Sequence, residues 1–189
     1  MEIQTVIFDL GKTLVPFDLG RLDANWARCR PEAKLLCERV ERGAVDADGF
    51  RREMSALAGI PPAGFDAWWN SIFDSDWLIP PQTVLGLKRH YRLGLLSNTN
   101  EPHFEHLLRV YPELAEFDFH ILSHEVGAAK PEAAIYAATE RAAGCPPEAI
   151  LYFDDVPAFV EAARRRGWQA HFSATILETV DRVLSSHRR

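Results

Sequence analysis

Four short segments of continuous apolar residues, each ending in polar residues, constrain the fold of this 189-residue chain most strongly. They are residues 5–8, 93–96, 117–122 and 149–153, and a fifth candidate, 168–172, follows Gly167. Continuous rather than alternating apolar character is typical of strands buried on both faces of a parallel sheet. The sequence therefore predicts a buried sheet built mainly from parallel strands.

Helical patterns separate the later apolar segments. Residues 131–143 begin with proline and glutamate, which are favoured in a first helical turn, and stop near Gly144. Residues 157–166 end in three arginines, which the helix dipole favours at a C-terminus. Strands that alternate with helices of this length predict an α/β fold with a doubly wound parallel sheet.

The segment 16–79 interrupts this alternation with three helical patterns, at residues 22–42, 47–58 and 64–73. Five aromatic residues supply much of its apolar mass: Trp26, Trp68, Trp69, Phe73 and Trp77. Pro80 and Pro81 are typical of a linker that returns to the sheet. We therefore expect a core formed by residues 1–15 and 80–189, with residues 16–79 inserted after the first strand as a small helical cap.

The composition argues against several classes of protein. A net charge of −6 gives no long-range attraction to nucleic acid, and no segment approaches the roughly 20 apolar residues of a membrane span. Three cysteines without metal-type spacing argue against a disulfide framework or a zinc site. We therefore expect a cytoplasmic protein that binds a small molecule, and neither nucleic acid nor a membrane. We also expect a monomer or homodimer, although the composition does not bear on that choice.

Polar side chains gather where the predicted strands end, which is the edge at which parallel α/β sheets bind ligands. These residues are Asp9, Ser97, Asn98, Asp154 and Asp155. Asp9 can attack phosphorus once a divalent cation screens its charge, and carboxylate oxygens are ligands that Mg²⁺ prefers. Ser97 and Asn98 can donate hydrogen bonds to phosphate, while Lys130 can offset the charge of a phosphoryl group in transfer. The set predicts magnesium-dependent chemistry on a small phosphorylated metabolite.

Four motifs resemble, in order, those of the haloacid dehalogenase superfamily. They are Asp9-Leu-Gly-Lys-Thr13, Ser97-Asn-Thr-Asn100, Lys130-Pro-Glu132 and Asp154-Asp155. The resemblance covers nearly the whole sheet-forming part, and the inserted helices lie where that superfamily carries its first type of cap. It implies a Rossmann-like core, a phosphatase with Mg²⁺ as cofactor, and an aspartyl-phosphate intermediate on the nucleophile Asp9.

The resemblance also implies a set of metal ligands. By the pattern of the superfamily, Asp9 and Asp155 bind magnesium directly, and the backbone carbonyl of Gly11 completes the protein ligands. Asp154 acts on a water molecule bound to the metal. We therefore expect these residues to meet at one point of the sheet edge.

Other residues are implied to bind the phosphate. Thr13 and Ser97 hold the phosphate or the loop of the first motif, and Lys130 orients the nucleophile and offsets charge. Within the superfamily, the second and third motifs look most like a bacterial branch of sugar-phosphate phosphatases that includes an α-glucose-1-phosphate phosphatase. A sugar phosphate is therefore the first substrate class to consider.

Gly11 departs from the pattern of most phosphatases of the superfamily, which carry a second Asp there to protonate the leaving group. The branch that the chain resembles also tends to carry Gly at this place, so the proton donor must come from elsewhere. Asp18, at the entrance to the predicted cap, and His103, close after the second motif, are the two candidates for an acid or a substrate contact. Each has an alternative local role, since Asp18 could begin the cap and His103 could begin a helix.

Three other functions remain open at this point. A 2-haloacid dehalogenase would use Asp9 on carbon without a metal, and Gly11 and the paired acids Asp154 and Asp155 argue against it. A phosphonate-cleaving relative tolerates a small residue at position 11 but needs a cap lysine for a Schiff base, for which Lys34 is the one candidate. A catalytically idle member that binds a ligand or a partner is the third, and Gly11 is the feature that supports it.

Overall fold

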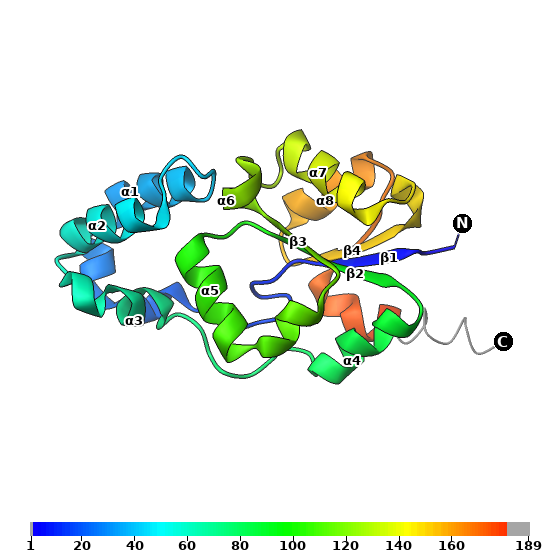
Figure 1. The fold of residues 1–189 in the computed structure, drawn as a ribbon, viewed down its shortest axis with the longest axis horizontal. Helices are drawn as coiled ribbons and strands as arrows, with labels where there is room; N and C mark the ends of the chain where they lie inside the picture. The colour runs from blue at the N-terminus through cyan, green and yellow to red at the C-terminus, as the bar shows by residue number, and fades with distance from the viewer. Residues whose placement is uncertain (1, 181–189) are drawn as a thin grey trace.

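The structure is a computed structural model that describes residues 2–180 (Figure 1). Its sheet has five parallel strands in the order β3-β2-β1-β4-β5. The strands are β1 (Thr5–Phe8), β2 (Arg92–Ser97), β3 (Phe119–Leu122), β4 (Ile150–Asp154) and β5 (Gln169–Phe172). All five predicted strands are present within two residues of their expected bounds, and the predicted doubly wound parallel sheet is confirmed. Residues 181–189, which the sequence analysis assigned to the core, lie outside the described residues.

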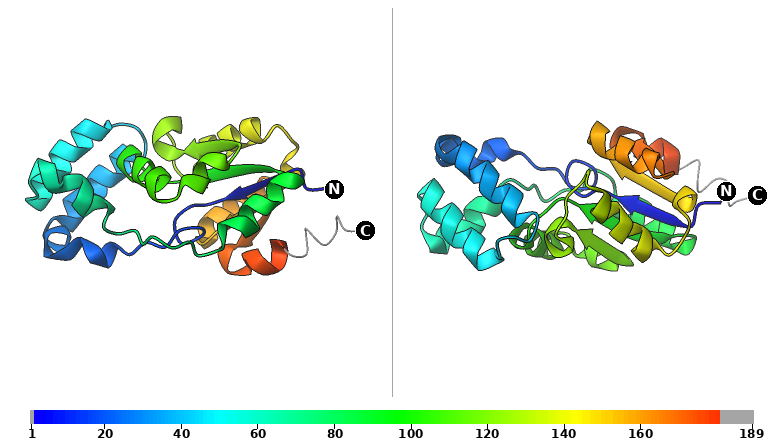
Figure 2. Two further views of the ribbon diagram at one scale, coloured as in Figure 1. Left: turned by 60° about the horizontal axis from the view of Figure 1, so that its bottom comes forward. Right: turned by 90° about the horizontal axis from the view of Figure 1, so that it is seen from above.

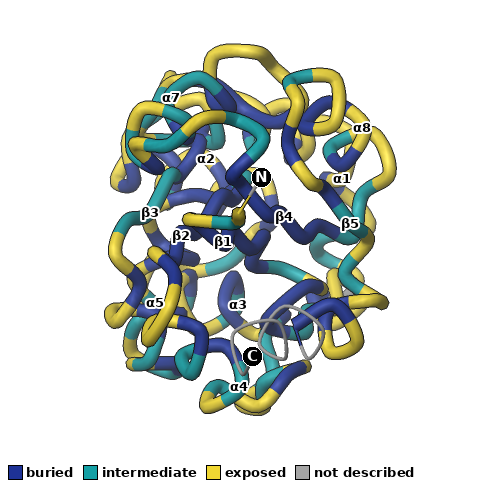
Figure 3. The backbone as a smooth tube through the Cα atoms, turned by 90° about the vertical axis from the view of Figure 1, so that its right-hand side faces the viewer, coloured by how far each residue is buried: buried dark blue, intermediate teal, exposed yellow. Residues whose placement is uncertain are grey.

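Strand register aligns the ends of β1, β2 and β4. Phe8 pairs with Leu95 on one side and with Phe153 on the other, so the residues that follow lie at one edge. The backbone N–H of Asp9 donates to the carbonyl of Phe153 at 2.8 Å, which extends the pairing to the first residue beyond β1. The central strands are buried, as Figure 3 shows. Side chains at this edge are therefore held by a rigid frame.

Helices cover both faces of the sheet because successive strand side chains point to opposite faces. On one face, Val6 and Phe8 pack in a cluster that includes residues of α4 (Pro81–Leu85) and α5 (Glu101–Val110). On the other face, Ile7 packs in a cluster with residues of α7 (Ala133–Ala143) and α8 (Pro157–Arg165), as Figures 1 and 2 show. The short helix α6 (Ser123–Val126) follows β3. Short 3-10 turns lie at Leu19–Leu22, Pro62–Gly64, Gly86–Arg89, Pro112–Glu116, Pro147–Ala149 and Ser173–Thr175.

The helices of segment 16–79 gather at one end of the molecule, beyond the carboxyl ends of the strands (Figure 2). They are α1 (Asp23–Val40), α2 (Ala47–Ala58) and α3 (Phe65–Asn70), and they share a hydrophobic cluster of their own around Phe50, Phe65 and Trp69. The predicted helix 47–58 is confirmed, with Asp46 capping its start through the backbone N–H of Gly49 at 2.7 Å. Their role as a cap with boundaries 16 and 79 stays a prediction.

Two predicted helices begin or end differently. The pattern at 64–73 gives α3 only to Asn70, because Phe73 pairs as an antiparallel bridge with Phe17 where the chain enters and leaves the three helices. The pattern at 131–143 gives a helix from Ala133, because the backbone N–H of Glu132 donates to the carbonyl of Ala129 in a turn at 2.7 Å.

None of the helices in residues 2–180 combines the length and the apolar character that a membrane crossing requires. The thiols of Cys29, Cys37 and Cys145 are free, so no disulfide joins the segments described.

Candidate active site

Lys130 connects the carboxylates at the ends of β1 and β4. Its ammonium group donates to Oδ1 of Asp9 at 2.7 Å and to Oδ2 of Asp154 at 2.6 Å. The carbonyl of Leu96 and the hydroxyl of Tyr152 accept from the same group at 3.0 and 3.2 Å. The Lys130 side chain is 1% exposed and that of Asp154 is fully buried, so these are desolvated charge-assisted contacts. Their geometry fixes the orientation of the Asp9 carboxylate.

Three carboxylates of the described residues meet beside the ammonium group of Lys130. Asp9, Asp154 and Asp155 each offer an oxygen, and the three oxygens lie within 4.8 Å of one another. Burial raises the pKa of Asp9 to about 6, with the charge of Lys130 acting against this and that of Asp154 adding to it. Burial and the charge of Asp154 also raise the pKa of Asp155. A divalent cation would offset this surplus negative charge, and an all-oxygen donor set fits magnesium.

Gly11 lies two residues after Asp9 in a tight loop, in which the backbone N–H of Lys12 donates to the carbonyl of Val15 at 2.7 Å. A Cβ atom added to Gly11 would lie 2.7 Å from Cε1 of Phe17, which is closer than real contacts allow. The phenyl ring therefore occupies the position that a side chain at residue 11 would need.

The predicted phosphate-binding residues have different surroundings. Asn98 makes two hydrogen bonds with the backbone of Lys130, donating from Nδ2 to its carbonyl at 3.0 Å and accepting at Oδ1 from its N–H at 2.7 Å. Thr13 is buried, and its hydroxyl has no hydrogen-bond partner among the described residues. Ser97, at the end of β2, contributes to the wall of a cavity. The amide of Asn98 thus positions the loop that carries Lys130.

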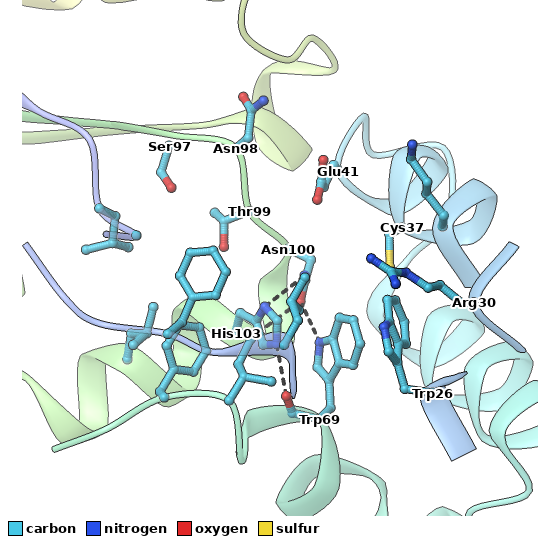
Figure 4. Close-up of a pocket in the computed structure, with 18 residues that line it drawn as sticks. Trp26, Arg30, Cys37, Glu41, Trp69, Ser97, Asn98, Thr99, Asn100 and His103 are labelled. Atoms are coloured by element: carbon cyan, nitrogen blue, oxygen red, sulfur yellow. Dashed lines mark hydrogen bonds between the residues drawn. The ribbon is translucent and has the colours of Figure 1, made fainter. Parts of the chain in front are cut away.

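A cavity of about 440 Å³ lies between this edge of the sheet and the helices of segment 16–79 (Figure 4). On the side of the sheet it is lined by Leu10, Gly11, Ser97, Asn98, Thr99, Asn100, His103 and Leu107. Its other wall is formed by Phe17, Leu19, Trp26, Arg30, Lys34, Cys37, Glu41, Trp69, Ile72 and Phe73. A volume of this size, with apolar walls and a few polar groups, is typical of a site for a small metabolite.

His103 lies in this cavity wall but is buried. Its Nδ1 pairs with Nδ2 of Asn100 at 3.2 Å, its Nε2 pairs with the carbonyl of Trp69 at 3.2 Å, and its ring stacks on that of Trp69 with centroids 4.6 Å apart. Burial lowers the pKa of His103 to about 3. The ring is therefore neutral and joins α5 to α3.

Asp18, the other candidate acid, is exposed and is absent from the cavity wall. Its Oδ1 accepts a hydrogen bond from the backbone N–H of Gly20 at 2.8 Å, and its own N–H donates to the carbonyl of Ile72 at 2.9 Å. These contacts hold the turn at which the chain enters segment 16–79.

Helix α1 faces the cavity with residues of which only Lys34 was singled out from the sequence, as a candidate for a Schiff base. Five of them, separated by three or four positions, lie along one face of that helix and its C-terminal end: Trp26, Arg30, Lys34, Cys37 and Glu41. The spacing was visible in the sequence, but it does not tell which face of an isolated helix turns toward the sheet. Tyr152 was also missed, because it lies among apolar residues of β4 that are typical of a buried strand. Its hydroxyl contacts both Lys130 and Asp154.

Comparison with known proteins agrees with this geometry. Residues 3–167 match the family model of the haloacid dehalogenase-like hydrolases. A D-ribitol-5-phosphate phosphatase from Bacteroides thetaiotaomicron is 25% identical over 187 residues, which cover 88% of this chain and 90% of the relative. The predicted resemblance to a family of phosphatases is thereby confirmed.

Solved structures of haloacid dehalogenase family proteins are also similar to this chain. A haloacid dehalogenase family enzyme from Bacteroides thetaiotaomicron has a TM-score of 0.81 at 25% identity, covering 91% of this chain and 94% of its own. The wild-type form of that enzyme, in complex with magnesium and inorganic phosphate, has a TM-score of 0.78 at 26% identity, with 90% and 93% covered. A predicted haloacid dehalogenase-like family hydrolase from Porphyromonas gingivalis has a TM-score of 0.74 at 26% identity, with 91% of this chain and 90% of its own covered. The chain belongs to the haloacid dehalogenase-like hydrolases.

Proposed function

We propose that this hydrolase is a magnesium-dependent phosphomonoesterase that acts on a small phosphorylated metabolite, with sugar and polyol phosphates as the first classes to test. The observation that carries the proposal is the meeting of three carboxylates and one buried lysine at the ends of β1 and β4. The ribitol-phosphate phosphatase among the relatives and the magnesium and phosphate bound to a similar enzyme support it.

In this proposal Asp9 is the nucleophile. Lys130 holds Oδ1 of Asp9, which leaves the other carboxylate oxygen to attack phosphorus in line and form an aspartyl-phosphate. Water then hydrolyses that intermediate. Magnesium held by Asp9, Asp154, Asp155 and the carbonyl of Gly11 would screen the carboxylates from the phosphate dianion.

Lys130 and Ser97 complete the phosphate site. The ammonium group of Lys130 offsets charge on the phosphoryl group, and the hydroxyl of Ser97 donates to a phosphate oxygen. Asn98 keeps Lys130 in register through its two backbone hydrogen bonds, and Thr13 supports the loop after β1. Residues 16–79 act as the cap that covers the cavity and selects the substrate.

The proposal is tested by phosphate release from a panel of sugar, polyol and other metabolite phosphates, with magnesium and with EDTA. We expect turnover that depends on magnesium and is lost in the Asp9→Asn variant. Asp18→Asn, which changes an exposed carboxylate outside the cavity, is the matched control and should retain turnover. Absence of turnover across the panel, or full activity of Asp9→Asn, would overturn the proposal.

A phosphonate-cleaving activity is the second candidate, because Lys34 lines the cavity from α1. A lysine in that wall could form a Schiff base with a carbonyl group of a phosphonate substrate. Borohydride trapping with a carbonyl-bearing phosphonate, followed by mass spectrometry, tests it directly. Labelling at Lys34 would favour this candidate, and its absence together with phosphomonoester turnover would exclude it.

A further inference from the structure

The cavity wall contains one carboxyl group that the proposed mechanism does not use. Glu41 follows the last residue of α1 and lines the cavity, and Figure 4 shows its carboxyl group on the side of Asn98 and Thr99. Among the described residues that line this cavity, Glu41 is the only Asp or Glu. The carboxyl group of Glu41 therefore lines the same cavity as Ser97, which belongs to the proposed phosphate site.

The surroundings of Glu41 favour its protonated form. Its side chain makes no hydrogen bond or ion pair with another side chain in the described part of the chain, and burial raises its pKa. Its position at the C-terminal end of α1 adds to this, because the helix dipole disfavours a negative charge there. The positive charge of Arg42 acts against it, but that guanidinium is paired with Glu132 at 3.0 Å.

The proposed reaction needs a proton donor that the first motif does not supply. Gly11 has no side chain, and the ring of Phe17 fills the space beside it. The carboxylate of Asp18 is turned to solvent outside the cavity. The neutral ring of His103 has both nitrogens engaged with Asn100 and with the backbone of segment 16–79.

The remaining titratable groups of the cavity are unsuited to the role. Burial raises the pKa of the Cys37 thiol to about 12, and a general acid works best when its pKa is near the working pH. Arg30 and Lys34 carry basic groups, which suit the binding of anions rather than the protonation of a leaving group. A carboxyl group is the acid whose pKa burial most readily brings toward neutrality.

We propose that Glu41 is the proton donor to the leaving-group oxygen, acting from the cap side of the cavity. This inference rests on the proposed phosphomonoesterase function. As the bond between phosphorus and the leaving oxygen breaks, its electron pair stays on oxygen and Glu41 transfers its proton there, so that a neutral alcohol departs. When water attacks the aspartyl-phosphate, the Glu41 carboxylate takes a proton from that water, which restores the acid and yields phosphate.

The test is the dependence of kcat/KM on the leaving group, measured with aryl and alkyl phosphates. Aryl leaving groups such as 4-nitrophenolate need no proton, whereas alkoxides do. We expect Glu41→Gln to lower kcat/KM for alkyl phosphates by about 100-fold or more while 4-nitrophenyl phosphate changes less than about threefold. The plot of log kcat/KM against leaving-group pKa should therefore become steeper in the variant.

Glu38→Gln is the matched control, because Glu38 lies on the same helix but is exposed and outside the cavity wall. It should keep the wild-type slope, and Glu41→Asp should regain part of the alkyl phosphate activity. The role of Glu41 would be overturned if Glu41→Gln lost kcat/KM equally on aryl and alkyl phosphates, or if its plot against leaving-group pKa kept the wild-type slope. In either case, activity of the wild-type protein would still support the phosphatase function. No magnesium-dependent turnover of any phosphomonoester, aryl or alkyl, by the wild-type protein would overturn both proposals.

Discussion

The phenyl ring of Phe17 lies where a side chain at Gly11 would have to extend, with only 2.7 Å between its Cε1 and a Cβ atom built on the glycine. The ring packs edge-on against Phe73, with centroids 6.3 Å apart, so its movement is restricted. The absence of a second aspartate in the first motif is therefore matched by a residue that fills its place. The two positions depend on each other.

A double-mutant cycle between positions 11 and 17 tests this dependence. Gly11→Ala should lower the free energy of unfolding by about 1–3 kcal/mol, because the added methyl group overpacks the ring of Phe17. In a Phe17→Ala background, Gly11→Ala should lower the free energy of unfolding by less, since the phenyl ring no longer occupies the space beside residue 11. Urea unfolding of the four proteins measures the coupling, and strictly additive losses would contradict it.

Replacing Lys130 by methionine should strongly destabilise the fold in EDTA. The change removes the ammonium group that contacts Asp9 and Asp154 and leaves these two buried carboxylates without an ion-pair partner among the described residues. Breaking a buried pair in this way costs about 3–5 kcal/mol, and turnover should be lost as well. Lys34→Met, at an exposed lysine without such partners, is the control for urea unfolding; equal losses in the two variants would be inconsistent with a buried ion cluster.

His103 should make the fold sensitive to acid. Its pKa is lowered to about 3 in the folded protein, whereas an unfolded histidine titrates near about 6.5. Below about pH 6.5, His103 binds a proton in the unfolded chain but not in the folded chain. The free energy of unfolding therefore falls as the pH falls toward 3. Between pH 7.5 and 5 the contribution of this residue is about 2 kcal/mol.

The check is urea unfolding of the wild-type protein and of His103→Gln at both pH values. The variant should lose about 2 kcal/mol less than the wild-type protein on acidification, whatever its stability at pH 7.5. An identical pH dependence in the two proteins would mean that His103 is protonated in the folded state.

Magnesium should stabilise the folded protein through the carboxylate cluster. At a concentration 100 times its Kd, a ligand of the folded state alone adds about 2.7 kcal/mol. Asp155→Asn should abolish this increase, and Asp18→Asn should preserve it because that residue is outside the cluster. Thermal unfolding with magnesium and with EDTA measures the effect, and an undiminished shift in Asp155→Asn would show that the metal binds elsewhere.

The sheet could be predicted because strands that are buried on both faces consist of continuous apolar residues, which are visible in the sequence. Segments such as 5–8 and 149–153 are apolar without interruption, and the structure places strands there with small shifts. The predicted helix 47–58 agrees with α2, whose ends carry local signals: Asp46 caps the start, and Gly59 has a left-handed conformation after the last residue.

The sequence was less informative where contacts between distant segments determine the end of a helix or the surroundings of a side chain. The bridge between Phe17 and Phe73 shortened a predicted helix, and no local pattern announces it. The choice between Asp18 and His103 as acid also depended on packing, since only the structure gives one an exposed turn and the other a buried pair of hydrogen bonds. Glu41 escaped notice for the same reason, because its relevance depends on which face of α1 is turned toward the sheet.

The position of β1 in the sheet has a consequence for biosynthesis. This strand precedes the other four described strands along the chain but lies at the centre, between β2 and β4, and Asp9 acquires its lysine partner only when residue 130 has been synthesised. Long-range parallel pairing of this kind forms late, after most of the chain is available. A ribosome-bound fragment that ends before β4 therefore has neither the central sheet nor the carboxylate cluster. Premature termination should yield inert chains rather than hydrolases of altered specificity.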